Sequence, residues 1–212
     1  MPATPAPSVA LRNAPSLNDG RLLECVVTSC NEDGSTNIAP MGPIVDDAIT
    51  RVLLRPFQSS LTFANLQRER RCILHITDDV ELIARSALNL LEETPAMTDG
   101  PGGGRVLAGA CRWFALSVEA IDASRDRAEV LCRVEERGRL RDFIGFNRAM
   151  HAVIEATILA TRLAIFPADE VHQQLPAFAT AVEKTGGPRE RRAFALVDDY
   201  IACELARNPS GG

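Results

Sequence analysis

The chain has 212 residues, of which 46% are hydrophobic and 24% are charged, and its formal net charge at pH 7 is −5. This apolar content excludes intrinsic disorder for most of the chain. A net negative charge disfavours nucleic acid, which needs a cationic surface, and 5% of aromatic residues offers few rings for stacking on bases. No run approaches the roughly 20 apolar residues of a membrane-spanning helix. We therefore expect neither nucleic acid nor a membrane as a partner.

The first 20 residues and the cysteines bear on the cellular compartment of the protein. Residues 1–20 are rich in Pro and Ala, without a basic leader or a signal-type apolar core, so we expect a disordered N-terminal arm. No CxxC pair and no His at metal-ligand spacing accompanies the six cysteines, which are Cys25, Cys30, Cys72, Cys111, Cys132 and Cys203. Free thiols in a reducing cytoplasm fit this pattern better than a disulfide framework, and we expect no metal site.

Residues 22–44 predict a β-hairpin. An apolar, β-branched run is followed by the turn sequence NEDG and by a second run, STNIAPMGPI. Asn31 and Asp33 suit the turn because their side chains bond nearby backbone, and Gly34 suits it because glycine tolerates positive φ. The two prolines of the second run cannot donate to a sheet ladder. We therefore place this strand at an edge or a bulge, with its backbone free for a ligand.

The remaining first part of the chain predicts short strands and two helices. The expected strands are 51–57, 71–77, 105–119 and 127–135, and a short helix is expected over 59–70. A second helix over 78–91 opens with a capping box in which Asp78 is the N-cap and Glu81 follows three residues later. Segment 92–105, with two prolines and four glycines, is expected to be a flexible connector. It lacks the Lys-Ser/Thr of a Walker phosphate loop.

The last third of the chain has helical periodicity. One long helix is predicted over 139–166, Pro167 starts a second helix, Pro176 kinks or restarts it, and Pro188 opens a last helix that ends near Arg207. Strands followed by about three helices, without an internal repeat, predict an α+β fold. The same order disfavours a doubly wound parallel sheet.

A guanidinium and three hydroxyls are grouped where the strand 51–57 meets the next helix. Arg55 ends the strand, and Ser59, Ser60 and Thr62 lie at the helix start, where free N–H groups and the helix dipole favour an anion. The planar fork of Arg donors suits a phosphate. The structural alternative is that Ser60 caps the helix and Arg55 is a solvated strand end.

Several of these stretches resemble a known family. The motifs NIAPMGP, TFANL and HIT resemble the flavin-reductase-like split barrels, and NEDGSTNIAPMGPI, RPFQSSLTFANL, HITDD and GFNRAMHAVIEATILATR are similar to the domain of unknown function 447 family of the FMN-binding split-barrel superfamily. The resemblance covers nearly all of the chain after residue 20. It implies FMN as cofactor, a homodimer, a split β-barrel flavin-binding domain over 21–136 and a C-terminal helical subdomain over 137–208.

The resemblance also implies roles for particular residues. Arg55, Ser59, Ser60 and Thr62 would hold the FMN phosphate, and Asn65 would brace the helix. Main-chain N–H groups would meet the isoalloxazine edge along the second hairpin strand, at Asn37, Ala39, Pro40, Met41 and Gly42. Flavin reductases usually have Lys-Asp before the Thr, whereas Ser60 and Leu61 stand here. The phosphate charge therefore falls to Arg55 or to a second subunit.

Two further polar groups have both a functional and a structural interpretation. His75 and Thr77 share one face of the strand 71–77, and His75 could donate to a flavin carbonyl or act as an acid. The alternative is a hydrogen-bonded structural histidine. Asn147, His151 and Glu155 recur every four residues. This polar stripe is either a solvated face or a buried network at a subunit interface or beside the flavin.

Function follows from the resemblance more than from any catalytic motif. We expect an FMN-binding flavoprotein acting as a cytoplasmic oxidoreductase, with no catalytic residue, substrate or electron donor identified. The alternative is a non-catalytic FMN-binding carrier, sensor or assembly protein, linked to pterin-type C1 cofactor metabolism. A GxSxG nucleophile elbow does not occur in the sequence, which disfavours hydrolase chemistry.

Overall fold

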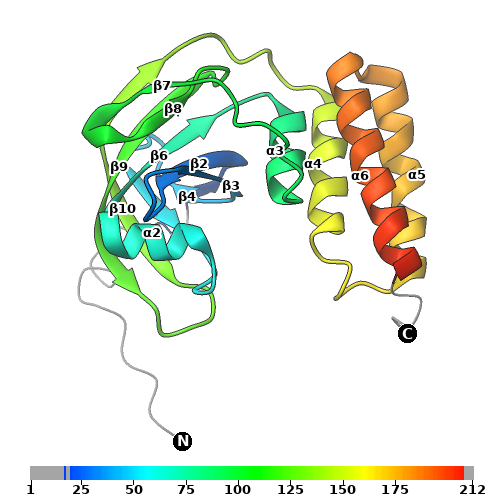
Figure 1. Cartoon of the computed structure of the whole chain (residues 1–212). Coiled ribbons are helices and arrows are strands. Elements are labelled where there is room, and N and C mark those ends of the chain that lie inside the picture. The colour runs from blue at the N-terminus through cyan, green and yellow to red at the C-terminus, as the bar shows by residue number, and fades with distance from the viewer. Residues whose placement is uncertain (1–16, 18–19, 208–212) are drawn as a thin grey trace, which may run out of the picture. The chain divides into compact units, whose positions relative to one another are not determined.

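The computed structural model describes residue 17 and residues 20–207 (Figure 1). The expected N-terminal arm over 1–20 lies almost wholly outside the described residues. The chain divides into two compact units, which we call the barrel unit, residues 1–77 with 95–142, and the helical unit, residues 78–94 with 143–212. No helix among the described residues is both long and apolar enough to cross a membrane.

One curled antiparallel sheet forms the barrel unit, with eight strands among residues 20–142 (Figure 1). The strand order is β1-β4-β5-β10-β9-β6-β2-β3, so that β1 and β3 form the edges. The strands are β1 (Arg21–Leu22), β2 (Cys25–Cys30), β3 (Thr36–Met41), β4 (Ile44–Val45), β5 (Arg51–Leu54), β6 (Arg71–Ile76), β9 (Arg112–Asp122) and β10 (Glu129–Arg139). Helix α2 (Leu61–Glu69) follows β5, as predicted.

The predicted hairpin is confirmed as β2 and β3, paired from Cys25↔Met41 to Cys30↔Thr36. Its turn closes through a bond from Asn31 N to Ser35 O of 2.8 Å, and Gly34 adopts a φ of 82° that a side chain would oppose. The prediction that the second strand lies at an edge is also confirmed. An edge is the position where a proline costs the sheet least.

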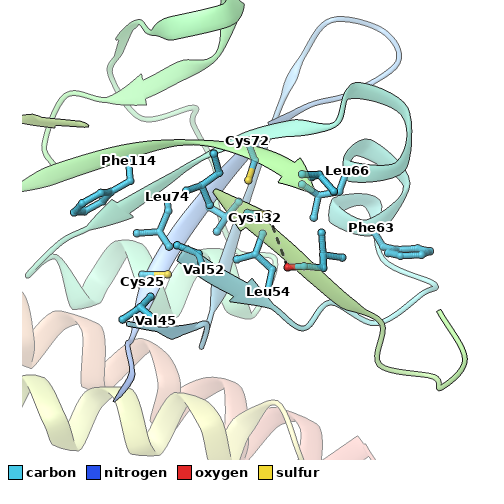
Figure 2. Close-up of a cluster of buried hydrophobic side chains, with 14 of the residues drawn as sticks. Cys25, Val45, Val52, Leu54, Phe63, Leu66, Cys72, Leu74, Phe114 and Cys132 are labelled. Carbon is cyan, nitrogen blue, oxygen red and sulfur yellow. Dashed lines mark hydrogen bonds between the residues drawn. The ribbon is translucent and has the colours of Figure 1, made fainter. Parts of the chain in front are cut away.

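Alternation along the strands divides the sheet into two faces. Val27, Leu74 and Phe114 lie opposite one another on β2, β6 and β9, and all three belong to the apolar core of the barrel (Figure 2). We call this the inner face. Burial of such a side chain stabilises the fold by about 1.5–3 kcal/mol. The intervening residues of the same strands, such as Ile73 and Ala115, lie on the outer face.

The segment expected to be a connector, 92–105, instead contributes to a second, two-stranded sheet. Strands β7 (Met97–Asp99) and β8 (Arg105–Leu107) pair antiparallel across the short 3-10 helix η2 (Pro101–Gly103). A Cβ on Gly104 would approach Ile73 Cδ1 to 2.6 Å, so the glycine lets the backbone pack directly on the outer face. The glycines therefore serve close packing as well as turning.

Four helices build the helical unit within residues 78–94 and 143–207. They are α3 (Val80–Ala87), α4 (Arg148–Ala160), α5 (Ala168–Thr185) and α6 (Pro188–Arg207). Their core includes Val80, Val153, Val171 and Val197, each at most 1% exposed. The sequence between β6 and β7 thus supplies a helix whose buried side chains pack with those of the C-terminal helices.

Three details of the helices differ from the predictions. The long helix predicted over 139–166 is wrong at its start, because β10 runs to Arg139, Gly145 has a φ of 108° and Asn147 caps α4. The N-cap of α3 is Asp79, whose side chain accepts from Leu82 N at 3.0 Å. Asp78 accepts from Ile144 N at 3.1 Å instead. Helix α5 continues through Pro176 without a break.

The polar stripe of α4 divides into one structural residue and two exposed ones. Asn147 accepts from the N–H groups of Ala149 and Met150 and donates to Thr185 O at 3.0 Å. His151 and Glu155 are exposed in the chain. This arrangement matches the interpretation of a solvated face.

Candidate cofactor site

The open edge of β3 is where the main chain can meet a ligand. Bonds from Asn31 N to Ser35 O and from Leu23 N to Pro43 O, of 2.8 and 3.0 Å, mark both ends of the ladder between β2 and β3. In an antiparallel pair the bonded positions alternate, so the odd-numbered residues of β3 face β2. The main-chain groups of Thr36, Ile38 and Pro40 then point away from the sheet, and those of Gly42 follow the same parity.

This parity changes which of the predicted main-chain contacts are available. Asn37, Ala39 and Met41 use their N–H groups toward β2, and Met41 also packs against the barrel core. Pro40 has no N–H, so its outward group is the carbonyl. The donors that remain at this edge are Thr36 and Ile38, which were not among the predicted residues, and Gly42, which was.

Helix α2 is tied to the hairpin by a polar network. Asn37 Nδ2 donates to Thr62 Oγ1 at 2.9 Å and to Ser29 Oγ at 3.3 Å. Asn65 Nδ2 donates to Ser29 Oγ at 3.0 Å and to Asn31 Oδ1 at 2.8 Å. Thr62 and Asn65 are 3% and 2% exposed. Both side chains are therefore suited to positioning the helix, as predicted for Asn65, more than to direct contact with a phosphate.

A residue outside the predicted set orients this network. Arg68 donates through Nη2 to Asn65 Oδ1 at 3.1 Å and to Cys30 O at 2.5 Å. Since the carbonyl oxygen of Asn65 accepts from Arg68, its Nδ2 is directed toward the hairpin. The signal in the sequence was the i, i+3 spacing of these two residues on a helix.

The start of α2 carries the two accessible hydroxyls of the predicted phosphate site. Ser60 caps the helix by accepting from Phe63 N at 3.2 Å, and its hydroxyl donates to Phe57 O at 2.7 Å. The structural interpretation of Ser60 is thus confirmed. Ser59 is exposed beside it. The first-turn N–H groups and the helix dipole remain favourable for an anion at this end.

Arg55 holds an orphaned buried polar atom. Its Nε is buried and has no hydrogen-bond partner among the described residues. Leaving a buried donor unsatisfied costs about 1–3 kcal/mol, and more when the group is charged. Arg55 follows β5 directly and precedes α2 by five residues. An unpartnered guanidinium N–H between a strand end and a helix start fits the phosphate of FMN.

His75 is sealed within the chain. It is 0% exposed, Nδ1 lies 3.2 Å from Val26 O, and Leu107 N donates to Nε2 at 3.1 Å. The neutral tautomer with a proton on Nδ1 satisfies both contacts. Burial lowers the pKa of His75 from 6.5 to about 4, while its bond to Val26 opposes the shift. Both nitrogens are engaged, as the structural interpretation requires.

The sheet also separates His75 from the network at α2. His75 lies opposite Val26 and Trp113 on the outer face, whereas Asn37 lies opposite Ser29 on the inner face. Thr77, just after β6, is 6% exposed. The structure therefore brings the residues of β3 and α2 together and leaves His75 and Thr77 apart from them.

The described part of the chain, residue 17 and residues 20–207, contains no candidate metal site. No three His, Cys, Asp or Glu side chains gather there as a ligand set. All six cysteines are free, four of them buried, and Cys30 and Cys203 exposed.

Solved structures with a similar fold include the following two. An FMN-bound DUF447 protein from Methanosarcina mazei superimposes with a TM-score of 0.73 at 22% identity, over 85% of this chain and 95% of that chain. A flavin reductase domain protein from Arthrobacter sp. FB24 gives a TM-score of 0.50 at 18% identity, over 58% and 80% of the two chains. The barrel unit has the FMN-binding split-barrel fold of the flavin reductases, which confirms the predicted α+β class.

The family follows from the sequence models. The model of the N-terminal domain of the protein of unknown function DUF447 matches residues 23–141, and the DUF447 model of the C-terminal part matches residues 147–199. Together the two matches cover most of the chain, on both sides of the short linker to α4. The chain belongs to the DUF447 family.

Proposed function

We propose that this chain is an FMN-binding flavoprotein and that it acts as an oxidoreductase. The observation that carries the proposal is the match over 85% of the chain to an FMN-bound member of the same family. The orphaned Nε of Arg55 and the open edge of β3 support it, because they are unsatisfied groups of the kinds that a phosphate and a ring with acceptor atoms would engage.

The proposed roles follow the accessibility of each group. Arg55 binds the phosphate, with Ser59 and the first-turn N–H groups of α2 beside it. Ile38 and Gly42 donate to the ring edge from the open side of β3. Thr62, Asn65 and Asn37 hold α2 against the hairpin. Bound FMN supplies the electron-transfer chemistry, and the chain supplies binding and orientation.

A homodimer is the second part of the proposal. Phe57 and Leu61, on either side of the α2 cap, are 53% and 63% exposed. Apolar side chains beside a polar site are suited to contact with another subunit. A second copy would also add charge near the phosphate, where this chain offers the guanidinium of Arg55. Light scattering on the purified protein tests this, and a monomeric mass at micromolar concentration would contradict it.

The second candidate function, FMN binding without turnover, is favoured by one specific observation. His75 is the barrel unit's single histidine, and it is buried with both nitrogens engaged. The barrel unit therefore offers no accessible histidine that could act as a general acid near neutral pH. A carrier, a sensor or an assembly protein in the cytoplasm, connected to pterin-type C1 metabolism, would need none.

The visible absorption spectrum of the untreated protein tests FMN binding. We expect flavin bands near the usual wavelengths, or their appearance when FMN is added to apoprotein at micromolar concentration. Emission of Trp113, the one tryptophan of the chain, offers a second readout for the titration. A colourless protein that fails to bind added FMN would refute the proposal.

Stopped-flow reduction separates the two candidate functions. The FMN-loaded protein is mixed with NADPH or NADH without oxygen, and the loss of flavin absorbance is followed. Reduction at a rate of about 1 per second or faster, within the ordinary range of enzyme turnover, supports the oxidoreductase. Free FMN at the same concentration is the control. A rate no faster than that control supports the carrier or sensor.

A further inference from the structure

A cavity of about 550 Å³ lies in the barrel unit, beside the start of β6 and the segment between β7 and β8. Its lining includes Thr28 of β2, Ile73 of β6 and Ala115 of β9, which are opposite one another in the sheet. None of the residues assigned to FMN lines it. The volume is within the range of pockets that hold small organic molecules.

One wall of this cavity is the glycine segment 101–104, held in place against the sheet. Gly104 leaves no room for a Cβ beside Ile73, and the Arg105 carbonyl accepts from Thr28 Oγ1 at 2.7 Å. The segment between β7 and β8 is therefore held in a fixed position against the outer face. A wall that is packed and hydrogen-bonded preserves the cavity in the absence of a ligand.

Three guanidinium groups and two carboxylates line the cavity. The arginines are Arg70, Arg71 and Arg105. Glu69 is already paired with Arg68 and Arg71, at 3.1 and 3.4 Å, Glu135 with Arg133 at 2.7 Å, and Arg105 with Asp99. Each guanidinium carries five N–H donors, and these ion pairs use a minority of them.

Arg70 lines the cavity and is also the C-cap of α2, where its φ of 56° ends the helix in a left-handed conformation. Its Nη2 donates to the carbonyls of Val118 and Glu119, at 3.2 and 3.4 Å, which fixes the side chain over β9. We therefore assign the anion to the other two arginines.

We infer that this cavity binds a small organic anion. Its carboxylate or phosphate group meets Arg71 and Arg105, and its apolar body lies on Ile73 and Ala115. The proposed anion contacts are all outside the residues assigned to FMN, although the cavity reaches Ser29, which accepts from Asn37 and Asn65. The inference holds whether or not the chain binds FMN.

Cys30 provides a covalent probe, because it is exposed and lines the cavity. Its thiolate displaces iodide from iodoacetate, an anion, or from iodoacetamide, a neutral analogue, and each forms a thioether. A reversible anion complex that precedes alkylation makes the rate saturate with iodoacetate concentration. We expect saturation at Cys30 with iodoacetate and a linear dependence with iodoacetamide. Exposed Cys203, in the helical unit, is the internal control and should be linear with both.

Two variants at the cavity and one control variant locate the effect. Arg71→Gln should raise the half-saturating iodoacetate concentration by about threefold to tenfold, the cost of one charged hydrogen bond in a solvated rim. Arg125→Gln, which removes an exposed charge from the turn after β9, should leave it unchanged. Ser117→Phe should fill the cavity and abolish saturation while preserving β propensity. Neither Arg71 nor Ser117 is fully buried, so neither substitution removes a core side chain.

Benzoate tests the site at equilibrium. We expect benzoate to protect Cys30 from both reagents in the wild type and not in Ser117→Phe, and to leave Cys203 unprotected. The same protection is expected in protein saturated with FMN, which separates this site from the flavin. Linear kinetics at Cys30 with iodoacetate, or equal behaviour of Arg71→Gln and wild type, would overturn the inference.

Discussion

His75 and Arg55 both place a nitrogen in the interior of the barrel unit, and the two surroundings differ in one respect. The ring of His75 has a partner at each nitrogen, Val26 O and Leu107 N. The Nε of Arg55 has none among the described residues. One region is complete without a ligand, whereas the other leaves a charged donor unsatisfied.

This difference predicts two kinds of response to mutation. Where the chain satisfies its own polar groups, a substitution removes interactions of the native state, so the free energy of unfolding falls. Where a donor is left for a ligand, a substitution removes an unsatisfied group, so the apoprotein loses little and ligand affinity falls. Stability is therefore the readout near His75, and affinity is the readout near Arg55.

The largest expected effect is the pH dependence of stability from His75. Its pKa is about 4 in the folded protein and 6.5 when unperturbed, so the unfolded state binds the proton first as the pH falls. The stability is complete above pH 6.5 and is lost progressively down to pH 4. The loss amounts to about 3 kcal/mol, from 1.36 kcal/mol per pKa unit. Urea unfolding at a series of pH values measures it.

The matched variants for this prediction are His75→Gln and His151→Gln. His75→Gln removes the titrating ring, so its stability between pH 6.5 and 4 should be flatter than that of the wild type. His151 is exposed, and its replacement should leave the wild-type slope. Equal slopes for His75→Gln and the wild type would mean that the ring is not sealed.

The second prediction concerns Arg55→Met. FMN affinity should fall by about 1–3 kcal/mol, the cost of a lost charged hydrogen bond. The stability of the apoprotein should stay within about 0.5 kcal/mol of wild type or rise, because an unsatisfied buried donor is removed. Fluorescence titration with FMN and urea unfolding without FMN give the two numbers. A loss of apoprotein stability with unchanged FMN affinity would show that Arg55 makes its interactions within the chain, as His75 does.

Arg51→Met is the control for this variant. Arg51 begins β5, four residues before Arg55, and is paired with Glu119 at 3.8 Å. A half-exposed pair at that distance is worth little, so neither affinity nor stability should change by more than about 0.5 kcal/mol. A fall in affinity for both variants would indicate a general effect of net charge.

The hairpin shows how much of the site the sequence already contained. The turn NEDG and the prolines after it predicted β2, β3 and the edge position, all confirmed. The same residues determine the parity: Pro40 has no N–H, so it must face outward, and Ile38 and Gly42 must do so with it. Ile38 could thus have been found by counting from Pro40.

Other features depend on contacts between distant segments, which local patterns do not report. The strand pattern around His75 is the same whether β8 covers its face or a ligand does. Asp78 and Asp79 are equally good caps, and the choice between them depends on Ile144, 66 residues away, which takes Asp78 as its acceptor. The start of α4 was missed because β10 continues to Arg139 beside β9, a pairing that outweighs helical propensity.

A third prediction tests the network that positions α2. Asn37→Ala removes the donor to Thr62 and Ser29, so stability should fall by about 1 kcal/mol and FMN affinity should fall with it, because α2 is less well placed. Thr36→Ala, the neighbouring position on the other face of β3, should change neither. A loss of affinity without a loss of stability would make Asn37 a direct ligand.

A fourth prediction separates the two roles of Ser60, as helix cap and as phosphate ligand. Ser60→Ala removes the cap of α2 and should cost about 1 kcal/mol of unfolding free energy, whereas Ser60→Asp keeps a capping oxygen and should stay within about 0.5 kcal/mol of wild type. The carboxylate of Ser60→Asp would repel a phosphate at the same helix start, so this variant should bind FMN more weakly than Ser60→Ala does. Urea unfolding and FMN titration of the pair decide the matter. Equal affinity in Ser60→Asp and wild type would show that the phosphate is bound away from this helix, whatever the outcome at Arg55.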